Sequence, residues 1–279
     1  MGTSSANRGT GGNGTPLVPS WLEEPGAWTD QEPENAEAST DSPPIPEPGE
    51  PDRYTAARSA FSRFARSGGT DRVNLGRAVA GYVSRSSGGA AGAAQRMGSS
   101  RQTAARIVSF LGDAARHGIG EALKALNLSR LAGRPIEEVF TGLVDYFCPE
   151  GGGLDKDIAR DAFMQTVGDV AEQGVTDLNN LNFDQIQAVL EIFMTHAIEL
   201  RLYNEIGTKA ITLPTDTAAI NNVQAQLHDF VANGVADALG ELGGGLPTLA
   251  QDQVPAFLDS VFENAFIVLA AMGDAQEHG

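Results

Sequence analysis

The distribution of hydrophobic residues from Arg53 onward predicts helices rather than strands. Hydrophobic positions recur every three or four residues, which gathers them on one helix face, and sustained two-residue alternation is almost absent. In the second half of the chain, five such stripes run over residues 136–147, 159–170, 186–200, 220–239 and 254–269. The pattern predicts an all-α fold, with a helical bundle in the C-terminal part.

Shorter stripes predict further helices within residues 53–130. They comprise Ala57, Phe61 and Phe64, then Leu75, Val79, Tyr82 and Val83, then Ile107, Val108 and Leu111. The stretch from Ser86 to Ser100 is rich in Gly, Ala and Ser, so we expect a flexible connector or a weak helix there.

The first 52 residues, here called the leader, lack such stripes. They hold nine of the fourteen prolines, and most other positions are Gly, Ser, Thr or Glu. Such a segment cannot bury enough apolar area to offset the entropy cost of ordering it. We therefore expect a disordered leader.

Charge divides the chain into three segments. The formal net charge of −17 is made up of −9 in residues 1–52, +10 in residues 53–133 and −18 in residues 134–279. We accordingly divide the chain into the leader, a basic helical region (53–133) and an acidic helical domain (134–279).

The basic region is rich in Arg, whose planar guanidinium binds carboxylates and phosphates through paired hydrogen bonds. We expect a basic surface formed by Arg58, Arg63, Arg66, Arg72 and Arg77. Its partner could be nucleic acid, an acidic protein, or the acidic segment of the same chain. The neighbouring net charge of −18 repels a polyanion, which favours the protein partners.

Several function classes are not expected from the motifs. The single Cys cannot form an internal disulfide, and neither a secretory signal nor an apolar run of membrane-spanning length stands out, so we expect a cytoplasmic protein without a membrane segment. Phosphate-binding loops and nucleophile elbows are also missing. We expect neither an enzyme nor a bound cofactor.

Three side chains are candidates for reactive or metal-binding groups. His196 and Glu199 share a helix face, but the Glu-x-x-His order of bundle metal sites is reversed and unrepeated. The sequence therefore favours a structural or surface histidine over a metal site. Cys148 continues an apolar helix end, which favours packing over nucleophilic chemistry.

Two features of the leader point to interactions. Both tryptophans, Trp21 and Trp28, lie in it, and the hydrophobic segment around Trp21 suits a peptide that folds onto a groove of a partner or docks back onto its own helices. Removal of Met1 would leave the α-amine of Gly2 free, and such an amine titrates near pH ~8. A nucleophilic amine on a flexible arm could enter the active site of another enzyme.

Several strings together resemble a known family. They are Met-Gly-Thr-Ser-Ser at 1–5, Thr-Pro-Leu-Val-Pro-Ser-Trp-Leu at 15–22, Tyr-Thr-Ala-Ala-Arg-Ser-Ala-Phe-Ser-Arg-Phe-Ala-Arg-Ser-Gly-Gly at 54–69, Gly-Arg-Pro-Ile-Glu-Glu-Val-Phe at 133–140, Cys-Pro-Glu-Gly-Gly at 148–152 and Asn-Glu-Ile-Gly-Thr-Lys at 204–209. The chain resembles the QatB family, accessory subunits of the Qat anti-phage defence system of bacteria.

The resemblance implies a non-catalytic partner of QatC, a protein similar to the deazaguanine-forming enzyme QueC. It implies that Gly2 accepts a deazaguanine-type group and that Thr3, Ser4 and Ser5 are recognised by the modifying enzyme. The expected partner-binding residues are Pro16, Leu17, Val18, Pro19, Trp21 and Leu22. An ATPase, QatA, and a TatD-like nuclease, QatD, are further expected partners. The alternative is a nucleic-acid adaptor that presents phage DNA to the nuclease through the Arg-rich helices.

Overall fold

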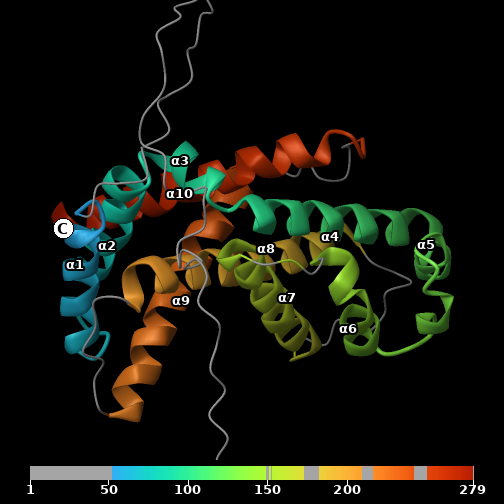
Figure 1. Cartoon of the computed structure of the whole chain (residues 1–279), viewed down its shortest axis with the longest axis horizontal. Coiled ribbons are helices and arrows are strands. Elements are labelled where there is room, and N and C mark those ends of the chain that lie inside the picture. The colour runs from blue at the N-terminus through green and yellow to red at the C-terminus, as the bar shows by residue number, and fades with distance from the viewer. Residues whose placement is uncertain are drawn as a thin grey trace, which may run out of the picture. The chain divides into compact units, whose positions relative to one another are not determined.

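The computed structural model describes residues 52–148, 151, 153–172, 182–208, 216–241 and 250–278. Within these ranges every regular element is helical, which confirms the all-α prediction (Figure 1). The predicted leader lies outside the described residues, apart from Asp52.

The described helices follow one another along the chain as listed here. They are α1 (Thr55–Arg66), α2 (Arg72–Gly81), the π-helix η2 (Tyr82–Ser86), α3 (Ala90–Gln95), α4 (Gly98–His117), α5 (Ile119–Ala125), the 3-10 helix η3 (Ser129–Leu131), α6 (Ile136–Phe147), α7 (Leu154–Glu172), α8 (Phe183–Leu202), the π-helix η5 (Tyr203–Gly207), α9 (Thr217–Glu241) and α10 (Val254–His278).

Helix α10 is the central packing element. It packs most extensively against α2 and also contacts α9, α3 and α4. Its buried face carries Leu258, Val261, Phe262, Ala265, Phe266 and Leu269. The last helical stripe predicted from the sequence therefore faces the core.

Helix α10 also bears on the prediction that the chain has no membrane segment. Over Val254–Gln276 it is long and apolar enough to cross a membrane, which the apolar runs alone did not indicate. Its outward positions include the exposed Asp259 and Glu263, and its apolar face is covered by neighbouring helices. Long core helices commonly meet the same length and composition criteria.

The Gly/Ala/Ser-rich stretch is not a flexible connector. It forms α3, between the end of η2 at Ser86 and the start of α4 at Gly98, and Ala93, Ala94 and Met97 are buried where this segment packs against α10. Of the two alternatives left open by the sequence, the helix is correct. Small side chains allow the two helices to approach closely. Packing against α10 therefore stabilises α3, although its own sequence pattern is only weakly helical.

Helices on both sides of the charge boundary at residues 133 and 134 contribute to one hydrophobic core. The cluster runs from Ala57 in α1 to Leu269 in α10 without a break between the basic and acidic segments. The boundary is therefore one of surface composition, and the two segments share their interior.

Candidate functional site

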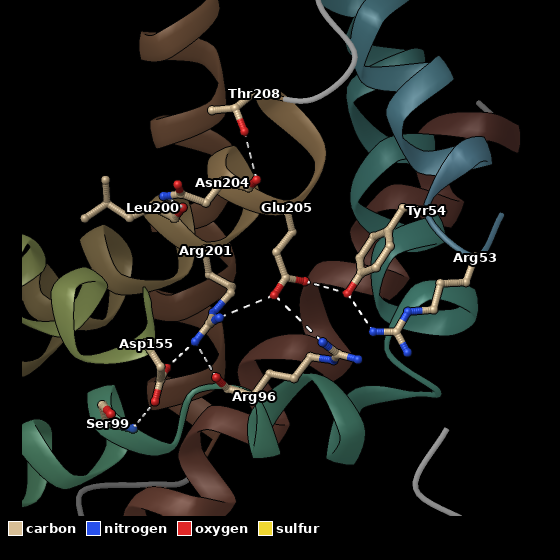
Figure 2. Close-up of polar contacts among 10 residues, drawn as sticks. All are labelled: Arg53, Tyr54, Arg96, Ser99, Asp155, Leu200, Arg201, Asn204, Glu205 and Thr208. Atoms are coloured by element: carbon tan, nitrogen blue, oxygen red, sulfur yellow. Dashed lines mark hydrogen bonds and ion pairs between the residues drawn. The ribbon is translucent and has the colours of Figure 1, made fainter. Parts of the chain in front are cut away.

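A network of charged and polar side chains joins the start of α1 to helices far along the chain. Tyr54, the residue before α1, donates its hydroxyl to Oε2 of Glu205 at 2.9 Å, and Arg53 donates to the Tyr54 hydroxyl at 3.0 Å (Figure 2). Tyr54, just after the leader, is thus bonded to η5, which directly follows α8.

The backbone at the end of α8 widens and turns Glu205 toward this network. Helix α8 continues into the π-helix η5, where the Thr208 amide bonds to the carbonyl oxygen of Tyr203 five residues earlier at 2.9 Å. The Asn204 side chain donates to the carbonyl of Leu200 at 2.8 Å, satisfying an acceptor within this stretch. Single π-turns of this kind often occur at functional sites.

Arg201 is the buried cation of the network, with 5% of its surface exposed. Its guanidinium donates to Asp155 of α7, to the backbone carbonyl of Arg96, and to Oε1 of Glu205 at 3.3 Å. Asp155 also accepts from the backbone amide of Ser99 at 2.7 Å (Figure 2). Because each buried charge has an opposite partner, the desolvation penalty is offset by ion pairing and hydrogen bonds.

Tyr54 is partly shielded from solvent by the groups around it. The guanidinium of Arg58 lies 4.8 Å from the centre of its ring, and Arg58 also donates to the backbone carbonyl of Glu205 at 3.0 Å. Burial, and secondarily the negative charge of Glu205, raise the pKa of the Tyr54 hydroxyl above its ordinary value. Tyr54 therefore acts as a neutral donor that fastens α1 to η5.

The five arginines predicted to form a basic surface are distributed over different environments. Arg58 belongs to the network, whereas Arg63, Arg66, Arg72 and Arg77 are exposed. Arg63 and Arg77, with Arg85, line a groove of about 370 Å³ between α1 and α2, which Asp274 of α10 also lines. Arg72 lines a second groove, of about 350 Å³, together with Asp229.

Part of the positive charge of the basic region is matched by the acidic region of the same chain. Arg96 lies 3.8 Å from Glu205, and Arg101 lies 2.5 Å from Asp259. These contacts are intramolecular, but neither arginine belongs to the five predicted to form the basic surface. Of the five predicted arginines, Arg63 and Arg77 are exposed and line the same groove.

The model for the Qat anti-phage system associated protein QatB matches residues 88–269. The chain belongs to the QatB family. The comparisons with curated proteins and with solved structures gave no match. Membership gives the protein a role in the Qat anti-phage system and confirms the resemblance found in the sequence.

The QatB match contains most of the network but not its first residues. Arg96, Asp155, Arg201 and Glu205 lie within 88–269, whereas Tyr54 and the two helices α1 and α2 precede it. All five arginines of the predicted basic surface also precede the matched range.

Several predicted site residues cannot be compared with the structure. Gly2, the recognition residues Thr3, Ser4 and Ser5, and the partner-binding segment from Pro16 to Leu22 lie outside the described residues. Their assignment to modification and partner binding stays a prediction.

Sequence patterns missed the network itself. Arg201 and Glu205 share a helix spacing of four, but their partners Tyr54 and Asp155 lie about 150 and 50 residues away in the chain. The one signal of the network in the sequence was Arg201 itself, a charged residue directly after the apolar helix stripe at 186–200.

Cys148 packs in the core at the end of α6, and burial raises the pKa of its thiol, which disfavours the reactive thiolate.

Proposed function

We propose that this QatB-family protein is a non-catalytic, cytoplasmic subunit that binds the QueC-like QatC protein and accepts a deazaguanine-type group on Gly2. The observation that carries the proposal is the family match over residues 88–269, together with the family-like start Met-Gly-Thr-Ser-Ser at 1–5. QatA-like ATPase and TatD-like nuclease subunits are further proposed partners.

The network at the start of α1 supports this role by fixing where the leader joins the helical body. Tyr54 is held by Glu205 and Arg53 donates to the Tyr54 hydroxyl, so the chain that precedes them starts from a defined point. A leader of about 50 residues attached there could reach a partner's active site while the body stays folded.

In the proposed modification, Gly2 reacts as a primary amine. After Met1 is removed, the neutral α-amine attacks an activated deazapurine carboxylate held by the QueC-like partner. A C–N bond forms, the activating adenylate leaves as AMP, and the amine proton passes to solvent, so the product is an amide. Thr3, Ser4 and Ser5 are the proposed recognition residues, and the segment from Pro16 to Leu22 is the proposed docking peptide.

Intact-mass spectrometry of the chain co-expressed with its operon partners tests the modification. We expect a mass increase that maps to the N-terminal peptide and is lost in Gly2→Pro, whose secondary amine is hindered. Gly9→Pro is the matched control in the same leader and should still be modified. An unmodified wild-type chain beside an active QatC would contradict the proposal.

Co-purification with QatC tests the docking peptide separately. Trp21→Ala should weaken binding, because a buried aromatic anchor commonly supplies 2 kcal/mol or more, roughly a 30-fold change in affinity. Trp28→Ala is the matched control, with the same residue type outside the segment. Equal losses in the two variants would argue against a specific role for Trp21.

The groove lined by Arg63, Arg77 and Arg85 favours a second candidate function, a nucleic-acid adaptor. Phosphate binding by several arginines makes affinity fall steeply as salt rises. If this function holds, the double variant Arg63→Ala/Arg77→Ala should bind DNA more weakly with a shallower salt dependence. The proposed subunit role predicts no salt-dependent DNA binding by the wild-type chain.

A further inference from the structure

Three neighbouring helices bring two histidines and two carboxylates together. Helix α8 supplies His196 and Glu199, α9 supplies His228, and α7 supplies Asp169. One ring nitrogen from each histidine and one carboxylate oxygen of Glu199 all lie within 4.8 Å of one another. This is the range of separations that a single metal ion can draw together through its bonds of about 2 Å.

His196 is the buried member of the cluster, with 7% of its surface exposed. Its Nε2 lies 2.7 Å from Oδ2 of Asp169, while its Nδ1 is buried and has no hydrogen-bond partner. Leaving a buried polar atom without a hydrogen-bond partner costs free energy, and a ligand bound at Nδ1 would remove that cost. In metal sites, a histidine characteristically binds the ion through one nitrogen and donates from the other to a carboxylate.

The remaining two side chains leave the cluster open to an incoming ion. Glu199 is 20% and His228 40% exposed, and His228 Nδ1 lies 3.0 Å from Oε2 of Glu199. The carboxylate of Glu199 therefore already faces a ring nitrogen of His228. The partial exposure also leaves room for water to complete the coordination of an ion.

We propose that His196, Glu199 and His228 form a binding site for a divalent transition-metal ion, with zinc as the ion best suited to the ligands, and that Asp169 orients His196. Two imidazoles and one carboxylate are a ligand set that binds zinc and leaves a fourth position open. The site lies within the range matched by the QatB family model and is independent of the proposed modification of Gly2. The sequence favoured a structural or surface role for His196, because helix spacing alone could not show that His228 and Asp169 lie beside it.

Metal titration of the full chain, purified without a polyhistidine tag and treated with EDTA, tests the site. Zinc added during isothermal titration calorimetry should bind at one ion per chain. Co²⁺ should give the visible absorption of a four- or five-coordinate site with nitrogen and oxygen ligands. Absence of stoichiometric binding of either ion would overturn the proposal.

Matched variants connect the binding to these residues. His228→Ala should abolish binding at concentrations that saturate the wild-type chain, and Asp169→Asn should weaken it by roughly 10–100-fold. His117→Ala removes an exposed histidine at the end of α4 and should change nothing. Circular dichroism checks that each variant is folded, with Glu199→Gln as a second ligand variant if His228→Ala is not. Unchanged zinc affinity in a folded ligand variant would overturn the assignment.

Discussion

Arg201 shows how one buried side chain can hold four helical segments in place. It bonds to Asp155 in α7, to the backbone of Arg96 after α3, and to Glu205 in η5, while Glu205 in turn holds Tyr54 before α1. Apart from Tyr54, whose ring also packs against the core, these residues contribute charge and hydrogen bonds rather than buried apolar surface. Their role is to fix the register of helices that hydrophobic contact alone would leave free to shift.

The first prediction compares two arginine ion pairs of different burial. Arg201→Ala should lower the free energy of unfolding by about 3 kcal/mol or more, because it leaves Glu205 and Asp155 without their buried partner. Arg116→Ala breaks the exposed pair with Asp113 and should cost less than about 1 kcal/mol. Urea denaturation measures both, and equal losses would contradict the structural role of Arg201.

Single residues are also where sequence-based reasoning was weakest. Spacing along a helix identified His196 and Glu199 as neighbours, yet it could not place His228 beside them, since that residue belongs to another helix. The same holds for Tyr54 and Glu205. Such contacts depend on how helices pack, and no local pattern encodes them.

Helices α2 and α10 cross at a pair of glycines. A Cβ atom added to Gly76 would lie 2.9 Å from the carbonyl oxygen and 3.0 Å from the Cα of Gly273. These are backbone atoms, so they cannot move aside without displacing the helix. The absence of side chains at both positions therefore permits the closest part of the α2–α10 interface.

The second prediction concerns this crossing. Gly76→Ala should destabilise the protein by about 1–3 kcal/mol, because the added methyl group forces the two helices apart. Gly168→Ala lies in the interior of α7, where an added Cβ meets no atom within 4 Å, and should stabilise by about 0.4–1 kcal/mol. Denaturation curves should thus show shifts of opposite sign, and shifts of the same sign would refute the close approach.

The third prediction concerns the start of α2. Asp71 accepts from the backbone amide of Asn74 at 3.1 Å and from its side chain at 2.7 Å, and these bonds lower the pKa of Asp71. Asp71→Ala should cost about 1 kcal/mol at neutral pH. Because the folded pKa is depressed, this stabilisation is complete above the ordinary pKa near ~4 and disappears as pH falls through the folded value.

Asp71→Asn is the control for the cap at Asp71. Asparagine is an equally good N-cap but does not titrate, so this variant should keep the stability and lose the pH-dependent part. Urea denaturation at neutral and at acidic pH measures the difference. A stability gap between wild type and Asp71→Ala that persists in acid would contradict the role of the carboxylate.

The sequence predicted most of the helices because their large apolar residues repeat with the helical period. The stripes at 136–147 and 254–269 became α6 and the buried face of α10. Helix α3 was left undecided because its contact with α10 uses Ala93 and Ala94, which carry little hydrophobic signal. The sequence pattern did not predict the π-helices either, because they differ from α-helices only in backbone hydrogen bonds such as that from Thr208 to Tyr203.

At the scale of the whole molecule, the two oppositely charged segments share one interior. The core extends from Ala57 to Leu269, and ion pairs such as Arg101 with Asp259 join the segments at the surface. Charge alone would have suggested two separate bodies. Neither the basic nor the acidic segment can bury its apolar residues fully without the other.

The fourth prediction tests what the leader contributes to the described body. Deleting residues 2–51 should leave the melting temperature unchanged, because the described core begins at Ala57. Deleting residues 2–54 should cost about 1–3 kcal/mol, since it also removes the bond between Tyr54 and Glu205. Differential scanning calorimetry compares the two. A loss of stability on the shorter deletion would support docking of the leader onto its own helices.

The crossing of Gly76 and Gly273 has a consequence for how the protein is made. The two residues are about 200 positions apart in the chain, and at translation rates of 5–20 residues per second about 10–40 s separate their synthesis. Throughout that interval the apolar face of α2 has no α10 to cover it. The leader emerges before either helix, so the modification proposed for Gly2 would not have to wait until α10 covers α2.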